Sequence, residues 1–166
     1  MFEYAQGHAN AFGISIDDTQ LRRFHEYANA ALANVNFGEN VYSVNFVRDA
    51  NSEDLHRMIL DIGAMNSIWG QHNPEPLIYI TPTTLNPANI SVMGANKDTI
   101  KFNINGIDYI KFHATDLINE LQSMQNFVKI EMVCKANINE WMGRLSPQMM
   151  IEDYEINEIQ NQEFNF

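Results

Sequence analysis

Cysteine and long apolar runs are scarce in this sequence of 166 residues. The single cysteine, Cys134, excludes a disulfide bond within the chain and is typical of a reducing compartment. No stretch of about 18 apolar residues is present, which excludes a membrane-spanning helix. Residues 1–5 also lack the basic-then-apolar pattern of a signal peptide. We therefore expect a cytoplasmic protein that does not contact membranes.

Positive charge is scarce as well. The chain has 10 Lys and Arg against 21 Asp and Glu, a formal net charge of −11, which at first argues against a nucleic-acid-binding protein. The imbalance is uneven, however: it amounts to −6 over residues 1–87, zero over 88–136 and −5 over 137–166. All five lysines lie in the neutral span.

The sequence has no recognisable catalytic motif. The five histidines are dispersed, and no Cys pair or His-x-x-x-His spacing offers a metal site. Walker, dinucleotide-binding and nucleophile-elbow patterns are absent too. We expect Cys134 to be a buried, inert thiol, because it falls on the apolar side of a predicted strand. The residues alone indicate a binding module rather than an enzyme.

The hydrophobic content of 45% indicates a folded chain, and apolar spacing predicts its elements. A short strand is expected at 14–16 and a helix begins after Asp17 or Asp18, with further helices after Asn51 or Ser52 and after Thr115. Strands are expected at 41–47, 77–81, 90–94, 99–104, 107–112, 127–136 and 148–156, with a loop over 137–147.

The pair Asn105-Gly106 is a strong signal for a two-residue hairpin turn. It places Phe102 opposite Tyr109 on the core face and turns Lys101 to the other face. We predict a mostly β fold with short helices (α+β): an OB-fold-like antiparallel barrel over residues 39–156, preceded by a strand-helix segment over 1–38 and followed by an acidic tail over 157–166.

Three stretches carry a resemblance to known proteins. Residues 7–16, Gly-His-Ala-Asn-Ala-Phe-Gly-Ile-Ser-Ile, resemble the Gly-Gly-His segment of the DHHA1 domain, with Gln6 in place of the first Gly and Phe12 in place of an Ala. Residues 68–77, with Trp-Gly-Gln-His-Asn-Pro-Glu-Pro at their centre, and residues 136–153 resemble two segments of the RecJ family, the single-stranded-DNA-specific 5′→3′ exonucleases of the DHH phosphoesterase superfamily.

The resemblance implies that the chain is the C-terminal part of such an enzyme, the end of DHHA1 (1–38) followed by an OB domain. The family's metal site, which takes Mn²⁺ or Mg²⁺, lies upstream, so the chain should hold no cofactor and no catalytic residue and be inactive alone. By the resemblance, Gly7 and His8 contact a substrate phosphate.

Five further residues are candidates for binding single-stranded DNA. Outward Lys101, Lys129 and Lys135 would line a groove, or else act as ordinary solvated strand lysines. Trp141 would stack on a base beside a phosphate-binding Arg144, or else pack across its hairpin. Trp69 is expected to anchor the double-proline loop rather than to stack on bases.

Two functions remain open at this point. The first is weak single-stranded DNA binding in support of an upstream nuclease core, in DNA repair or recombination. The second is an architectural role without DNA binding, in which the domain clamps the upstream domains or recruits a partner such as a single-strand-binding protein or a helicase.

Overall fold

The computed structural model describes residues 2–8, 11–35, 41–70 and 72–159, and the chain divides into two units, Met1–Val41 and Tyr42–Phe166. The domain boundary predicted between residues 38 and 39 and most of the predicted tail, 160–166, lie outside the described residues.

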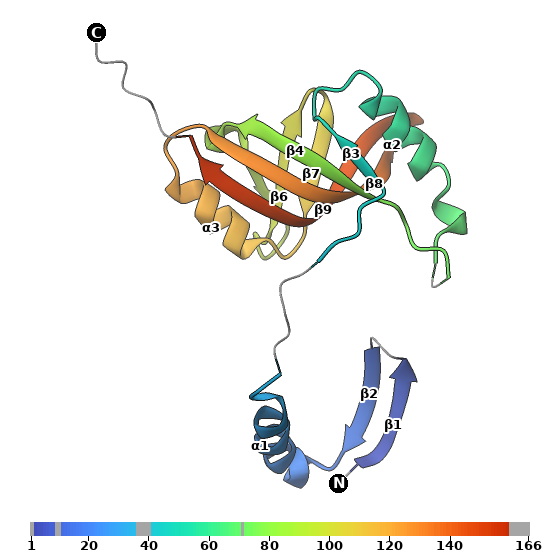
Figure 1. Cartoon of the computed structure of the whole chain (residues 1–166), viewed down its shortest axis with the longest axis vertical. Helices are drawn as coiled ribbons and strands as arrows, with labels where there is room; N and C mark the ends of the chain where they lie inside the picture. Colours follow the sequence, from blue (N-terminus) through green and yellow to red (C-terminus); the bar gives the residue numbers. More distant parts are fainter. Residues whose placement is uncertain (1, 9–10, 36–40, 71, 160–166) are drawn as a thin grey trace. The chain divides into compact units, whose positions relative to one another are not determined.

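The first unit contains a hairpin and a helix (Figure 1). Strand β1 (Phe2–His8) pairs with β2 (Ala11–Ile16) in antiparallel register, with His8 opposite Ala11. The sequence predicted strand only at 14–16, so β1 is an addition. The Asp17 carboxylate accepts a hydrogen bond from the Thr19 amide at 2.8 Å, which confirms the predicted cap at the start of the helical segment.

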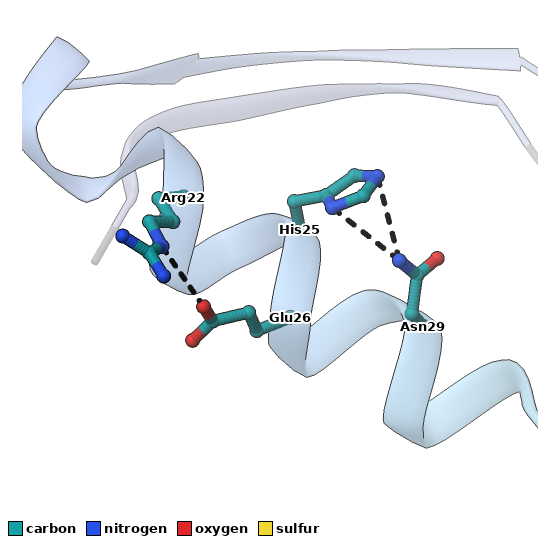
Figure 2. A network of polar contacts seen from close by, with 4 residues as sticks. All are labelled: Arg22, His25, Glu26 and Asn29. Atoms are coloured by element: carbon teal, nitrogen blue, oxygen red, sulfur yellow. Dashed lines mark hydrogen bonds and ion pairs between the residues drawn. The ribbon is translucent and has the colours of Figure 1, made fainter.

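Helix α1 (Leu21–Leu32) follows the short 3₁₀ turn Asp18–Gln20. Its polar side chains pair along the helix, as Figure 2 shows. Arg22 Nε lies 3.1 Å from Glu26 Oε1, and the Asn29 amide nitrogen lies 3.3 and 3.4 Å from the two ring nitrogens of His25. These are four-residue spacings, which place two side chains on the same side of a helix.

The second unit is built on a seven-stranded sheet with the order β3-β4-β8-β9-β7-β6-β5 (Figure 1). Its strands are β3 (Phe46–Arg48), β4 (Leu77–Leu85), β5 (Ser91–Met93), β6 (Thr99–Ile104), β7 (Ile107–Lys111), β8 (Val128–Trp141) and β9 (Arg144–Glu158). Its helices are α2 (Leu55–Gly63) and α3 (Thr115–Ser123), with short 3₁₀ turns at Asn66–Ile68 and Pro87–Asn89. The predicted mostly β class with short helices is confirmed.

The sheet differs from the expected antiparallel barrel in two respects, because it contains parallel pairs and because it is open. Two neighbouring pairs, β3 with β4 and β7 with β9, are parallel. Strands β3 and β4 are parallel because a crossover connection that contains α2 brings the chain back to the same end of the sheet before β4 begins. Among the described residues β3 and β5 end the sheet and do not pair with each other, so the sheet is mixed and open.

The predicted β6–β7 hairpin is confirmed residue by residue. Phe102 lies opposite Tyr109 and Ile104 opposite Ile107, as the two-residue turn requires. Gly106 has a positive φ of 79° and Asn105 one of 49°, the left-handed conformation that such a turn needs. The rings of Phe102 and Tyr109 stack with centroids 5.7 Å apart, and both side chains are buried.

The core lies between the inward face of the sheet and the two helices. Every second residue of β8 from Val128 to Ala136 is buried, while the residues between them point outward. Helix α2 buries Leu55, Ile59 and Ile62, and α3 buries Leu117, Ile118 and Leu121, apolar residues that recur in the sequence at the spacing of one helix face. Cys134 is fully buried, and burial raises the pKa of its thiol, so the expectation of a buried, inert thiol is confirmed.

The predicted loop over residues 137–147 is wrong. Strand β8 continues to Trp141 and β9 begins at Arg144, so the two form one long hairpin closed by Met142-Gly143. Both turn residues have positive φ, 49° and 76°. A turn of this kind favours Asn-Gly or Asp-Gly, and methionine in the first position hid it in the sequence.

Close packing of α2 on β8 gives a first test of the fold. A Cβ added at the buried Gly63 would lie 2.6 Å from Ile138 Cγ1, whereas one added at Gly70 would have no atom within 4 Å. Gly63→Val should therefore lower the free energy of unfolding by about 1–3 kcal/mol, the usual cost of overpacking. Urea denaturation measures it, with Gly70→Val as the control. Equal effects of the two substitutions would contradict this packing.

A partly buried ion pair in the β6–β7 hairpin predicts a pH effect. Lys101 Nζ lies 3.0 Å from Asp108 Oδ2, and Asn103 donates to the other oxygen at 2.8 Å. Partial burial acts to raise the pKa of Asp108, but these hydrogen bonds outweigh it and hold the pKa below its ordinary value of 3.8.

Because the folded-state pKa is depressed, the stabilisation is present at neutral pH and is lost as the pH falls below 3.8. Asp108→Asn should therefore lower the melting temperature at pH 7, and the difference from the unaltered chain should vanish in acid. Asp61→Asn, which breaks a mostly exposed ion pair with Arg57, is the control. A difference for Asp108→Asn that is independent of pH would contradict the assignment.

Candidate nucleic-acid interface

Two of the three predicted lysines lie in one row across the outward face of the sheet. The register joins β6 to β8 through β7 and β9, so Lys101 and Lys135 are separated by three strand spacings, about 14 Å. From β5 to β4 the row contains Ser91, Lys101, Ile110, Met150, Lys135 and Leu77. The row is therefore cationic near both ends and apolar between the lysines.

Both lysines of this row are engaged by acidic side chains. Lys101 is paired with Asp108, and Lys135 Nζ lies 2.8 Å from Glu152 Oε1. Both lysine side chains are only about one-third exposed. A phosphate that contacts either lysine must therefore compete with a carboxylate, which weakens the contact.

Lys129 differs from the other two lysines. It lies on the same outward face of β8 as Lys135, six residues nearer the start of the strand, and it is exposed. No ion pair includes it in the part of the chain that the structure describes. It is the predicted lysine best placed to meet a phosphate.

The tip of the β8–β9 hairpin presents apolar side chains to solvent. Trp141 is 71% exposed, Met142 91% and Leu145 54%, and Arg144 lies directly opposite Trp141. The alternative in which Trp141 packs across its hairpin is not observed. An exposed indole beside a guanidinium has the chemistry to stack on a base and to hold its phosphate.

Trp69, by contrast, packs against the hydrophobic core as a half-buried side chain. Asn73, in the double-proline loop, donates a hydrogen bond to the Ile68 carbonyl at 3.1 Å, next to Trp69. This placement agrees with the anchoring role expected for Trp69.

An acidic strip on the same outward face was missed by the sequence analysis. Glu131 of β8 lies directly opposite Glu155 of β9, and both flank a cavity of about 320 Å³ that Asp153 and Tyr79 also line. The Tyr79 hydroxyl donates a hydrogen bond to Glu131. Opposed carboxylates repel each other and repel phosphate. The face is thus of mixed charge, with the strip between Lys129 and Lys135.

Gly7 and His8 end β1 of the first unit, where the chain passes to β2. They lie in a different unit from the other five candidates, so the structure does not join them to the sheet face. Their role in phosphate binding remains a prediction.

The described residues offer no metal site, since no three or more of their His, Cys, Asp and Glu side chains cluster in a way that could hold an ion. In the described part, no helix is long and apolar enough to cross a membrane.

Sequence comparisons match the chain to exonucleases. It is 30% identical over 169 residues to the SPbeta prophage-derived protein YorK of Bacillus subtilis (strain 168), named as a single-strand DNA-specific exonuclease, with all of this chain and 29% of YorK covered. It is 29% identical to the single-stranded-DNA-specific exonuclease RecJ of the same organism, over 93% of this chain and 20% of RecJ. The chain thus spans less than a third of either relative.

A solved structure shows the same fold. The crystal structure of RecJ from Thermus thermophilus in complex with Mn²⁺ superposes with a TM-score of 0.55 and 18% identity, covering 95% of this chain and 22% of that one. The RecJ OB domain model matches residues 49–153, which include most of the sheet and both of its helices. The chain therefore belongs to the RecJ OB domain family.

Proposed function

We propose that this chain is the substrate-handling C-terminal region of a RecJ-like 5′→3′ exonuclease and that its OB sheet binds single-stranded DNA. The observation that supports this most directly is the outward side of the β8–β9 hairpin. It bears at its start an exposed lysine with no ion pair among the described residues, and at its tip an exposed tryptophan and arginine. Cations that contact the phosphate backbone, together with an aromatic ring that stacks on the bases, are typical of a surface that binds single-stranded DNA.

The dimensions of this path fit a single strand better than a small ligand. Lys129 and Trp141 are twelve residues apart on β8, at most about 40 Å along an extended strand. Single strands occupy roughly 4–16 nucleotides per OB fold, so one strand can reach both ends of such a path.

The catalytic part of the enzyme is proposed to lie in sequence that this chain does not contain. The relatives are more than three times as long, and the RecJ crystal structures are of complexes with Mn²⁺ or Mg²⁺. On this view residues 1–38 are the end of a DHHA1 domain, where Gly7 and His8 contact a phosphate, and the chain is inactive alone. The enzyme would act in DNA repair or recombination in the cytoplasm.

The acidic strip favours a second candidate function. Glu131, Asp153 and Glu155 attract basic surfaces, so the sheet would instead clamp the upstream domains or recruit a single-strand-binding protein or a helicase. A pull-down with these proteins at low salt separates the two functions. Capture that is lost on Glu131→Gln, without oligonucleotide binding, would support the second.

The electrostatic part of the first function predicts a salt dependence. Oligo-dT should bind the 166-residue chain weakly, and the logarithm of affinity should fall with the logarithm of salt concentration with a slope of about −2, for about three neutralised phosphates. Lys129→Gln should make this slope shallower in fluorescence anisotropy titrations. Lys97→Gln, which removes an exposed lysine from the turn between β5 and β6, is the matched control. The first function fails if no binding is seen at low salt.

If a base stacks on Trp141, the affinity for oligo-dT should depend on the aromatic ring of this residue. Trp141→Ala should weaken oligo-dT binding by roughly 5- to 100-fold, because stacking on one base contributes about 1–3 kcal/mol. Trp141→Phe should restore most of the affinity, and Leu145→Ala, which removes an exposed apolar side chain without a ring, should have little effect. Equal losses for Trp141→Ala and Leu145→Ala would show general apolar contact rather than stacking.

A further inference from the structure

A second cavity on the outward face is lined both by side chains that donate hydrogen bonds and by side chains that accept them. It measures about 230 Å³ and is lined by Asn66, Glu75, Lys135, Ala136, Asn137, Met150 and Glu152. These residues come from β8, β9, the 3₁₀ turn after α2 and the segment before β4. Hydrogen-bond donors and acceptors therefore meet in one small pocket, with Met150 and Ala136 as its apolar part.

The charges in the pocket do not balance. Lys135 is paired with Glu152, which leaves the Glu75 carboxylate without a cation of its own among the described residues. Partial burial, together with the nearby Glu152, raises the pKa of Glu75, although Lys135 opposes the shift. A ligand that donates hydrogen bonds to this carboxylate would stabilise its charged form, while a phosphate would be repelled.

The side-chain amides of Asn137 and Asn66 supply hydrogen-bond donors that complement the Glu75 carboxylate. Asn137 Oδ1 accepts a hydrogen bond from the Ile138 amide at 2.7 Å, and its NH₂ group has no partner in the described part of the chain. The Asn66 side chain has none there either. The pocket thus offers amide donors beside a carboxylate acceptor, an arrangement that fits the edge of a base carrying an amino group next to a ring acceptor.

The position of the pocket connects it to the proposed DNA path. Lys135 lies midway between Lys129 and Trp141 on β8, and Asn137 is four residues from Trp141 on the same outward face. A single DNA strand that follows β8 towards the hairpin tip would pass directly over this cavity.

We propose that this pocket takes one unpaired nucleobase of the bound strand and prefers bases with an exocyclic amino group, such as cytosine, over thymine. The inference rests on the proposed function, since it needs a single strand on this face. Glu75 accepts from the amino group and the amides of Asn66 and Asn137 donate to the ring acceptors. Thymine has a carbonyl oxygen where cytosine has its amino group, so it faces the carboxylate with an acceptor.

Competition between oligo-dC and oligo-dT for the 166-residue chain at neutral pH tests the proposal. The unaltered chain should bind oligo-dC at least about five-fold more tightly, the lower end of the discrimination given by a good base contact. Glu75→Gln should abolish the preference while oligo-dT binding is kept. Glu155→Gln, which removes a carboxylate of the same face outside the pocket, should leave the preference intact.

The outcomes separate this inference from the function on which it rests. Binding of both oligonucleotides with equal affinity, or a preference that survives Glu75→Gln, would overturn the base pocket alone. A lack of binding to either oligonucleotide would overturn the proposed function and the pocket with it. Thermal unfolding of each variant shows whether it is folded. Asn137→Ala, which removes an amide donor on β8, should reduce the same preference independently.

Discussion

The antiparallel pairing of β8 with β9 is the interaction on which the rest of the second unit depends. It joins the two halves of the sheet, because β4 pairs with the outer edge of β8 and β7 with the outer edge of β9. The register of this hairpin sets which side chains face the core from Val128 to Ala136 and which face solvent. It also carries Trp141 and Arg144 to the tip, so the same pairing that organises the core positions the candidate interface.

Charge on the outward face is arranged so that its cations are largely occupied. Lys101 and Lys135 each have a carboxylate partner, and Glu131 opposes Glu155 between the rows of Lys135 and Lys129. A face of this kind binds a polyanion weakly and leaves more of the contact to stacking and to hydrogen bonds with bases. Under the proposed function, weak binding would let the DNA strand move past this face while an upstream core degrades it.

Much of the fold was predictable because local signals and the final structure agree. Asn105-Gly106 determined the β6–β7 register, and the apolar spacing of α2 and α3 gave their buried faces. The parallel pair of β3 with β4 was not predictable, because it depends on the crossover through α2 rather than on any local pattern. The hairpin at Met142-Gly143 was missed because methionine there lacks the usual turn signal.

The candidate site was predictable only in part. Alternation along β8 placed Lys129 and Lys135 outward, but their ion pairs depend on contacts across the sheet. The Glu131–Glu155 opposition depends further on a bulge at Glu152, where the register shifts by one residue. No local sequence pattern predicts that shift. The sequence therefore predicted neither the acidic strip nor the pocket beside Glu75.

The central claim is that the outward side of the β8–β9 hairpin holds an unpaired strand. Mapping of backbone amide chemical shifts by NMR during titration with oligo-dT at low salt tests it most directly. The shift perturbations should follow β8 from Lys129 through Lys135 to the turn at Met142-Gly143, and α2 and α3 should be unaffected. Perturbations confined to the helices or to the β3 edge, or none at saturating oligonucleotide, would contradict it.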